Sequence, residues 1–324
     1  MWKILSYLQK NLIWTIPAMM IVGLLYGRFL DASPLKGSII PLTFLMVYPM
    51  MVNLQIDKVF SREGQRCQLV TQIINFAIIP FVAFFLGRWF FPGQPMVVLG
   101  LLLAALLPTS GMTITWTGFA GGDINAAIKM TVIGLVAGSI ATPFYAKWLM
   151  GTVIEIPLLD VFKQIILIVF VPMVLGYLTQ KWLIRRYGQE AYQRDLKKKF
   201  PMLSTAGVLG IVFVAMALKS GSILGNPGML LGYLAPLVLL YLINFLLSTV
   251  VGKLYFPRGE AIALVYGTVM RNLSIALAIA MTVFRDKGAE IAIIIAMAYI
   301  VQVQAAAWYV RLTDRLFGKA PETA

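Results

Sequence analysis

Ten long apolar runs constrain the fold of this 324-residue chain more than any other feature. A bilayer core about 30 Å thick needs roughly 20 apolar residues per helix, and the runs match that length. Hydrophobic residues make up 60% of the chain and charged residues 12%, whereas soluble proteins hold about a quarter charged residues. The sequence therefore predicts an all-α membrane protein with ten transmembrane helices. The predicted spans are 11–30, 38–56, 68–90, 96–119, 123–149, 160–183, 202–220, 228–252, 260–284 and 288–311.

The basic residues that produce the net charge of +14 flank the apolar runs and form no continuous patch. This pattern is typical of a protein that faces anionic membrane lipids, and we expect no nucleic-acid partner. Ten spans leave 17 basic residues on the side of the two termini and 8 on the opposite side, with Lys129 and Arg271 inside spans. By the positive-inside rule, we expect both termini in the cytoplasm and the protein in a prokaryotic inner membrane.

The domain organisation that we predict is two five-helix repeats of opposite orientation. Residues 1–150 form the first repeat, 151–184 the first helix of the second, 185–200 a basic cytoplasmic loop, and 201–324 the remainder of the second. The string Ile-Asn-Phe occurs in spans three and eight, which an inverted repeat would match.

The composition also restricts the chemistry. The chain has no histidine and a single cysteine, Cys67, which we expect in a polar loop, so a His-based metal site and a disulfide framework are excluded. No predicted span carries a nucleophile with a base, a carboxylate pair or a set of metal ligands. We therefore expect no enzyme activity, no cofactor and no bound metal.

Spans four and nine are interrupted at mid-membrane depth. Span four continues from a Leu-rich start into Pro108 and Gly111, and these residue types remove a backbone hydrogen bond and loosen the helix. Span nine has Gly267 at the corresponding place in the second half. Two interrupted spans in corresponding positions are the best sequence pointer to a transporter's binding site. The alternative for span four is a kinked helix that packs through small residues.

Two basic residues lie inside spans. A guanidinium near the bilayer centre costs roughly 2.5–3.5 kcal/mol, so Arg271 is either a ligand on a transport pathway or a clamp for the carbonyls of a broken helix. Lys129 either extends to the cytoplasmic interface or, as the small residues Gly134 and Gly138 near it suggest, points inward. Five polar residues elsewhere in spans are expected to form interhelical hydrogen bonds. They are Gln72, Asn75, Asn244, Gln302 and Gln304.

Four motifs follow one another along nearly the whole chain. They are "LMVYPMMVNLQIDKV" at 45–59, "NFAIIP" at 75–80, "LPTSGMTITW" with "GGD" at 107–123, and "RNLSIALAIAM" at 271–281. In sequence and order they resemble the bile acid:sodium symporter superfamily, and within it the arsenite-permease branch. The resemblance implies ten helices in two inverted repeats, with a core domain, in which broken helices four and nine cross, and a panel domain of spans one, two, six and seven.

The chain departs from the family where the family binds its ligands. Arsenite permeases have a cysteine at the position of Thr109 and a glutamate at that of Ser274. The resemblance places one sodium site at Thr113, Ile114, Ala127, Thr131 and Gly267, where only two side chains have an oxygen, and a second at Asn75 and Arg271. We hypothesise that Arg271 and Lys129 are tethered cations that replace the two sodium ions. The candidate site consists of Asn75, Thr109, Ser110, Thr113, Lys129, Thr131, Arg271, Asn272 and Ser274, with helix breaks at Pro108, Gly111 and Gly267.

The resulting prediction is a secondary transporter that works by alternating access and moves a small anionic solute without sodium. Two alternatives stay open: a metalloid efflux permease that lacks the usual cysteine, and a non-transporting membrane sensor. The expected partners are the solute and membrane lipids. The substrate, the direction and coupling of transport, and the oligomeric state do not follow from the sequence.

Overall fold

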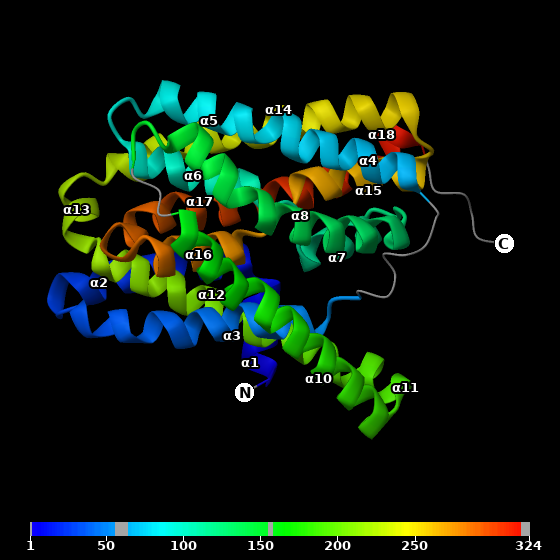
Figure 1. The fold of residues 1–324 in the computed structure, drawn as a ribbon, viewed down its shortest axis with the longest axis horizontal. Coiled ribbons are helices and arrows are strands. Elements are labelled where there is room, and N and C mark those ends of the chain that lie inside the picture. The colour runs from blue at the N-terminus through cyan, green and yellow to red at the C-terminus, as the bar shows by residue number, and fades with distance from the viewer. Residues whose placement is uncertain (1, 56–63, 155–157, 319–324) are drawn as a thin grey trace. The chain divides into compact units, whose positions relative to one another are not determined.

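The computed structural model of the chain describes residues 2–55, 64–154 and 158–318. Within these ranges it consists of helices and their connections and contains no β-strand (Figure 1). The chain forms two compact units, each made of three separate segments. The first unit comprises Met1–Leu54, Glu155–Tyr233 and Leu273–Ile300, and the second unit comprises Gln55–Ile154, Leu234–Asn272 and Val301–Ala324.

In the first unit, a long apolar helix, α12, packs against α2 and α3, and α10 packs against α3. Ser204 of α12 donates a hydrogen bond of 2.6 Å to the carbonyl of Met46, which fixes these two helices at close range. The helices of this unit are α1 (Trp2–Lys10), α2 (Leu12–Phe29), η1 (Ser33–Ser38), α3 (Ile39–Val52), α9 (Leu158–Ile165), η4 (Ile166–Phe170), α10 (Val171–Tyr187), α11 (Gln189–Ala191), η5 (Tyr192–Leu196), α12 (Lys199–Leu218), α13 (Ser220–Gly225) and α16 (Leu273–Val283).

The segment 185–200, which we expected as a loop, is helical over most of its length. Helix α10 continues to Tyr187, the chain turns at Gly188, which has a φ of +83°, and α11 and η5 follow. The reason is a buried anchor: Tyr192 is 1% exposed, and its hydroxyl lies 3.1 Å from both the carbonyl of Val52 and Oδ1 of Asn53. Burial raises the pKa of the Tyr192 hydroxyl. An aromatic ring with a satisfied hydroxyl thus orders a strongly basic segment.

The second unit contains the two helix breaks. Helices α4 and α15 lie side by side in it, and α7 and α8 pack together and against α15 (Figure 1). Its helices are α4 (Gln65–Ile73), η3 (Ile74–Ile78), α5 (Ile79–Phe90), α6 (Pro95–Leu106), α7 (Gly111–Phe119), α8 (Ile124–Met150), α14 (Gly228–Tyr255), α15 (Arg258–Val269), α17 (Arg285–Val310) and α18 (Thr313–Phe317). Helices α14 and α17 begin in the first unit and end in the second.

Cys67 corrects one expectation. It lies in α4, not in a polar loop, and is fully buried, with its thiol 3.4 Å from the carbonyl of Glu260. Helix α4 begins directly after Gly64, whose φ of +68° suits glycine. The connection that precedes α4 therefore ends before Cys67, although the residues around this cysteine are polar.

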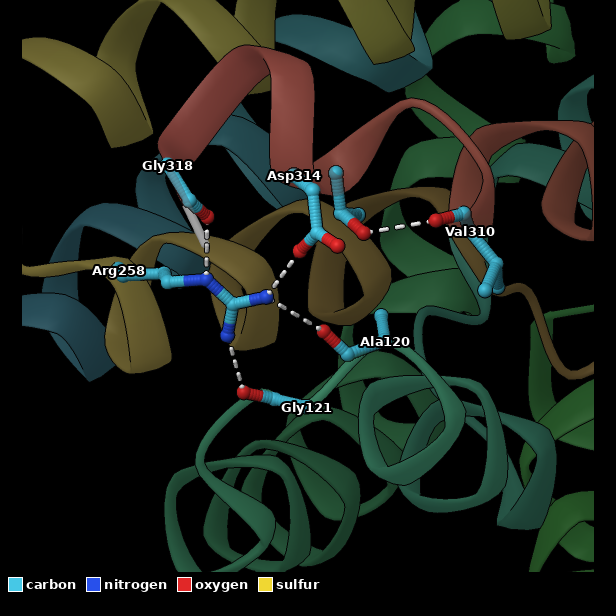
Figure 2. A network of polar contacts seen from close by, with 7 residues as sticks. Ala120, Gly121, Arg258, Val310, Asp314 and Gly318 are labelled. Carbon is cyan, nitrogen blue, oxygen red and sulfur yellow. Dashed lines mark hydrogen bonds and ion pairs between the residues drawn. The ribbon is translucent and has the colours of Figure 1, made fainter. Parts of the chain in front are cut away.

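The ends of four elements of the second unit meet around Arg258, the first residue of α15 (Figure 2). Its guanidinium donates to the carbonyls of Gly121 at 2.7 Å and Gly318 at 2.8 Å, which follow the C-terminal ends of α7 and α18. It also pairs with Asp314 at 2.8 Å. The amide of Asp123, the N-cap of α8, donates to the carbonyl of Gly259 at 2.9 Å.

Each of the ten predicted spans falls on a helix or on consecutive helices, with boundaries within a few residues. Seven helices of the described chain are long and apolar enough to cross a membrane, and a bent pair near the N-terminus would make an eighth. Spans four and nine fail this test because each is split into two short helices: α6 and α7, and α15 and α16. The chain is thus an all-α, multi-pass membrane protein, and the count of ten crossings stays a prediction. The charged end of the 45–59 motif, from residue 56 on, lies outside the described residues.

Candidate functional site

The two helix breaks of the second unit pair with each other through their backbones. Pro108 and Arg271 form an antiparallel bridge, in which the amide of Thr109 donates to the carbonyl of Met270 and the amide of Asn272 donates to that of Leu107. Both hydrogen bonds measure 2.7 Å. Unwound backbone inside a membrane protein must satisfy its polar groups internally. Here each break supplies the partners that the other one needs.

The C-terminal end of α15 is capped by asparagine side chains from two other helices. The last carbonyls of a helix have no partner within that helix. Asn75 donates to the carbonyl of Gly267 at 3.0 Å, and Asn244 donates to the next carbonyl, that of Thr268, at 2.8 Å. These are the asparagines of the two Ile-Asn-Phe strings. The expected interhelical hydrogen bonds of both residues are therefore confirmed.

A third amide, that of Gln302, holds the backbone of Arg271 from both sides. Its Oε1 accepts from the amide nitrogen of Arg271 at 2.8 Å, and its Nε2 donates to the carbonyl of the same residue at 3.3 Å. The hydroxyl of Tyr241 fixes the orientation of this amide by donating to Oε1 at 2.9 Å. Gln302 thus forms the expected interhelical contact, while Gln304 on the same helix is exposed.

The side chain of Arg271 has one of the two roles that its position suggested, that of a clamp, and its role as a ligand stays a prediction. The side chain is 3% exposed, and its Nη1 donates to the carbonyl of Ala105 at 3.0 Å. That carbonyl would normally accept from the amide of Thr109, which is instead directed to Met270. Arg271 is therefore a clamp for the broken fourth span. Its Nη2 is also buried but has no hydrogen-bond partner among the described residues, and that donor is free to bind a ligand.

Thr109 has a strained backbone at the break. It is the one described residue other than glycine with a positive φ, +63°, and a β-branched side chain in this region costs on the order of 1–3 kcal/mol. Its hydroxyl lies within hydrogen-bond distance of the carbonyls of Pro108, Thr131 and Met130, at 2.6, 3.2 and 3.3 Å. A hydroxyl has one proton, so it bonds one of these carbonyls at a time. Strain of this kind persists where the surrounding structure imposes it.

The hydroxyls proposed for sodium coordination have protein partners. Thr113 accepts from the amide of Ser110 at 3.1 Å, while Ser110 accepts from the amide of Met112 at 3.2 Å, which caps the start of α7. Thr131 donates to the carbonyl of Ala127 at 2.7 Å. Both threonines are nearly or fully buried. Thr113 therefore helps to begin α7, whereas Thr131 bonds inside α8. A cation would compete with the amide of Ser110 at Thr113, while the donating hydroxyl of Thr131 keeps its lone pairs.

Three members of the candidate site need separate comment. Gly267 lies inside α15, so the ninth-span break is at Met270–Asn272 and not at the glycine. Gly111 likewise is the first residue of α7, and the fourth-span break is centred on Pro108. Ser274 belongs to the first unit, where its hydroxyl bonds that of Tyr299.

Lys129 is buried, with 6% of its surface exposed, as expected for a lysine that points into the protein. It lies on α8, two residues before Thr131. Its role as a ligand or as a replacement for a sodium ion stays a prediction.

Sequence reasoning missed several residues that build the site. No sequence signal indicated the carbonyl of Ala105, which binds Arg271, or the hydroxyl of Tyr241, which binds Gln302. None indicated the contact between the hydroxyls of Ser248 and Thr268 at 2.6 Å. In each case the two partners lie 20 or more residues apart in the chain. Gln68 was also missed, although it precedes Gln72 by one helical turn and both side-chain amides are buried without a partner. A search for amides at helical spacing would have found this pair.

The fold and the site define a class: an all-helical, multi-pass membrane protein in which two broken spans are joined at a buried cation. The sequence matches the Sodium Bile acid symporter family over residues 40–226, more than half of the chain. This protein therefore belongs to that family and is a membrane transporter.

Three curated relatives are similar to the chain. The arsenical-resistance protein Acr3 of Alkaliphilus metalliredigens is 24% identical over 99% of this chain and 96% of its own. Acr3 of Corynebacterium glutamicum is 22% identical over 88% and 83%. The sodium/bile acid cotransporter 7 of Rattus norvegicus is 23% identical over 55% and 52%.

Proposed function

We propose that this protein is a sodium-independent secondary transporter of a small anionic solute that binds at the paired helix breaks. The observation that carries the proposal is the unpartnered, buried Nη2 of Arg271. A desolvated guanidinium donor binds oxyanions strongly, since charge-assisted hydrogen bonds are about twice as strong as neutral ones. Buried Lys129 adds positive charge, and Arg271 and Lys129 stand in place of two mobile sodium ions.

The transport mechanism that we infer is alternating access by movement of the two units. Support comes from the division of the chain. The first unit contains predicted spans one, two, six and seven, the expected panel, and also α16 and most of α17, while the second contains both breaks. The division thus matches the expected panel and core except for the second half of span nine and most of span ten. The ten-helix, inverted-repeat architecture, with its repeat boundaries, and the inner-membrane location with cytoplasmic termini belong to the same proposal.

The binding test is a thermal-shift screen of the purified protein against small carboxylates, sulfate and inorganic phosphate. A ligand at about 100 times its Kd stabilises the folded state by about 2.7 kcal/mol. We expect Arg271→Met to abolish the shift and Arg271→Lys to retain part of it, because lysine keeps the charge but loses the planar fork. Arg88→Met, at an exposed position of α5, is the matched control and should respond as wild type. An unchanged shift in folded Arg271→Met would contradict the proposal.

Metalloid efflux is the second candidate, and similarity to two arsenical-resistance proteins over most of the chain favours it. Against it stands Thr109, because a thiolate is the natural ligand of a thiophilic metalloid and Cys67, the single cysteine, is buried in α4. Expression in an arsenite-sensitive bacterium distinguishes the two: growth rescue that survives Arg271→Met would favour metalloid efflux over anion transport. A membrane sensor is the third possibility, and it predicts binding without transport in proteoliposomes.

A further inference from the structure

Unpartnered amide groups form a stripe along α4 and the start of η3. The side-chain oxygen and nitrogen of both Gln68 and Gln72, and Oδ1 of Asn75, are shielded from solvent and have no hydrogen-bond partner among the described residues. Spacings of four and three residues keep the three side chains on one side of the helix. At a rise of 1.5 Å per residue, the stripe extends over about 10 Å.

These unsatisfied groups are unusual for their surroundings. Leaving a buried amide unpaired costs roughly 1–3 kcal/mol, and native structures contain few such groups. Two other amides in the same unit are satisfied: Asn244 caps α15, and Gln302 holds the backbone of Arg271. Thr71, between the two glutamines on α4, also has a partner, the carbonyl of Cys67. Single atoms of Thr117 and Ser139 lack a partner as well, but Gln68 and Gln72 are the described residues in which both polar atoms of an amide do.

The stripe ends at the proposed binding site. The one amide group of the stripe with a partner is Nδ2 of Asn75, which donates to the carbonyl of Gly267. Gly267 precedes Arg271 by four residues on the ninth span, and Nη2 of Arg271 is likewise buried and without a partner among the described residues. The stripe therefore contacts the ninth span about one helical turn before the arginine of the proposed binding site.

We propose that Gln68, Gln72 and Asn75 line the path by which the solute reaches Arg271, and that the solute is a small hydrophilic anion. This inference rests on the proposed function. Each amide presents a donor and an acceptor, which can replace the hydration of a small ion with its bound water. A path lined by these amides suits a hydrophilic ion better than an amphipathic one, because the apolar part of an amphipathic ion would leave the amides without hydrogen bonds.

Cysteine accessibility in proteoliposomes of the full chain tests the path. In a Cys67→Ser background, Gln68→Cys and Gln72→Cys remove no hydrogen bond. Both should react with the negatively charged sulfonatoethyl methanethiosulfonate about tenfold faster than Ile74→Cys, a buried position two residues after Gln72. Gln65→Cys, exposed at the start of α4, shows that the reagent reaches the helix. Rates no faster than that of Ile74→Cys would overturn the path.

Two further measurements test the proposed path independently of the proposal that the solute binds at Arg271. Equal rates with the positively charged trimethylammonioethyl reagent would support the path while contradicting the preference for anions. Gln72→Met should leave the melting temperature unchanged or raise it, because the amide has no partner to lose, with exposed Gln65→Met as the control. A melting temperature lowered by several degrees would show that the amide makes fixed structural bonds and would overturn the proposal.

Discussion

At the residue scale, two glycines of α8 make room for the unwound segment of the fourth span. A Cβ at position 138 would lie 2.8 Å from Cδ of Pro108, and one at position 134 would lie 2.6 Å from the Thr109 hydroxyl. The small-residue face that the sequence showed on this helix therefore receives a helix break. Neither neighbour can easily move, because one is a ring and the other is β-branched.

We expect Gly138→Ala to destabilise the protein by about 1–3 kcal/mol, the usual penalty for overpacking a tight contact. The measurement is the thermal unfolding of purified protein in detergent. Gly111→Ala is the control, because no described atom lies within 4 Å of its added Cβ. Equal melting temperatures for Gly138→Ala and wild type would show that the break moves freely away from α8.

At the element scale, Arg258 joins the ends of helices. A cation at a helix N-terminus opposes the helix dipole, so its position at the start of α15 needs another explanation. The carbonyls that it binds follow the C-terminal ends of α7 and α18, where positive charge is favourable (Figure 2). It thus links one half of the broken fourth span to the first half of the ninth and to α18.

Arg258→Lys should destabilise the second unit by about 1–2 kcal/mol, because an ammonium cannot reach carbonyls on two sides as the guanidinium does. Asp314→Asn should have a smaller effect, below about 1 kcal/mol, because the Asp314 side chain is 63% exposed and its ion pair is weakened by solvent. Thermal unfolding of the two variants in parallel gives the comparison. If Asp314→Asn lost more stability than Arg258→Lys, the ion pair and not the carbonyl contacts would stabilise this junction of helix ends.

At the scale of the whole molecule, the family name implies sodium, whereas we propose transport without it. Ile114 and Ala127 have no side-chain oxygen, and Gly267 has no side chain at all. The hydroxyls of Thr113 and Thr131 are engaged with the backbone. A hard cation needs several oxygen ligands at once, and the side chains at these five positions offer two hydroxyl oxygens.

Anion binding and transport should therefore change less than about twofold when sodium chloride is replaced by choline chloride at constant ionic strength. Constant ionic strength matters because salt screens the attraction between an anion and Arg271. Ligand-induced thermal shifts and proteoliposome uptake both report the effect. A tenfold loss without sodium would rule out tethered cations as replacements for the ions.

The sequence by itself determined the membrane class, the approximate limits of the helices and the two spans that break. These features depend on local properties: the length of apolar runs, the absence of a backbone N–H group in proline and the absence of a side chain in glycine. Asn75, Asn244 and Gln302 were also recognisable as interhelical contacts, since an amide inside a membrane needs a partner. The same prediction was wrong for Gln72, which has no partner among the described residues, and for Gln304, which is exposed.

The tertiary structure alone decided how the breaks are satisfied. Arg271 reaches the carbonyl of Ala105, 166 residues away in the chain, and a local pattern contains no information about such a partner. The same reason explains why Cys67 is buried in α4 and why Tyr192 orders a basic segment that looked like a loop. That Nη2 of Arg271 has no partner is also visible only in the tertiary structure, because it depends on Nη1 being bound to the carbonyl of Ala105.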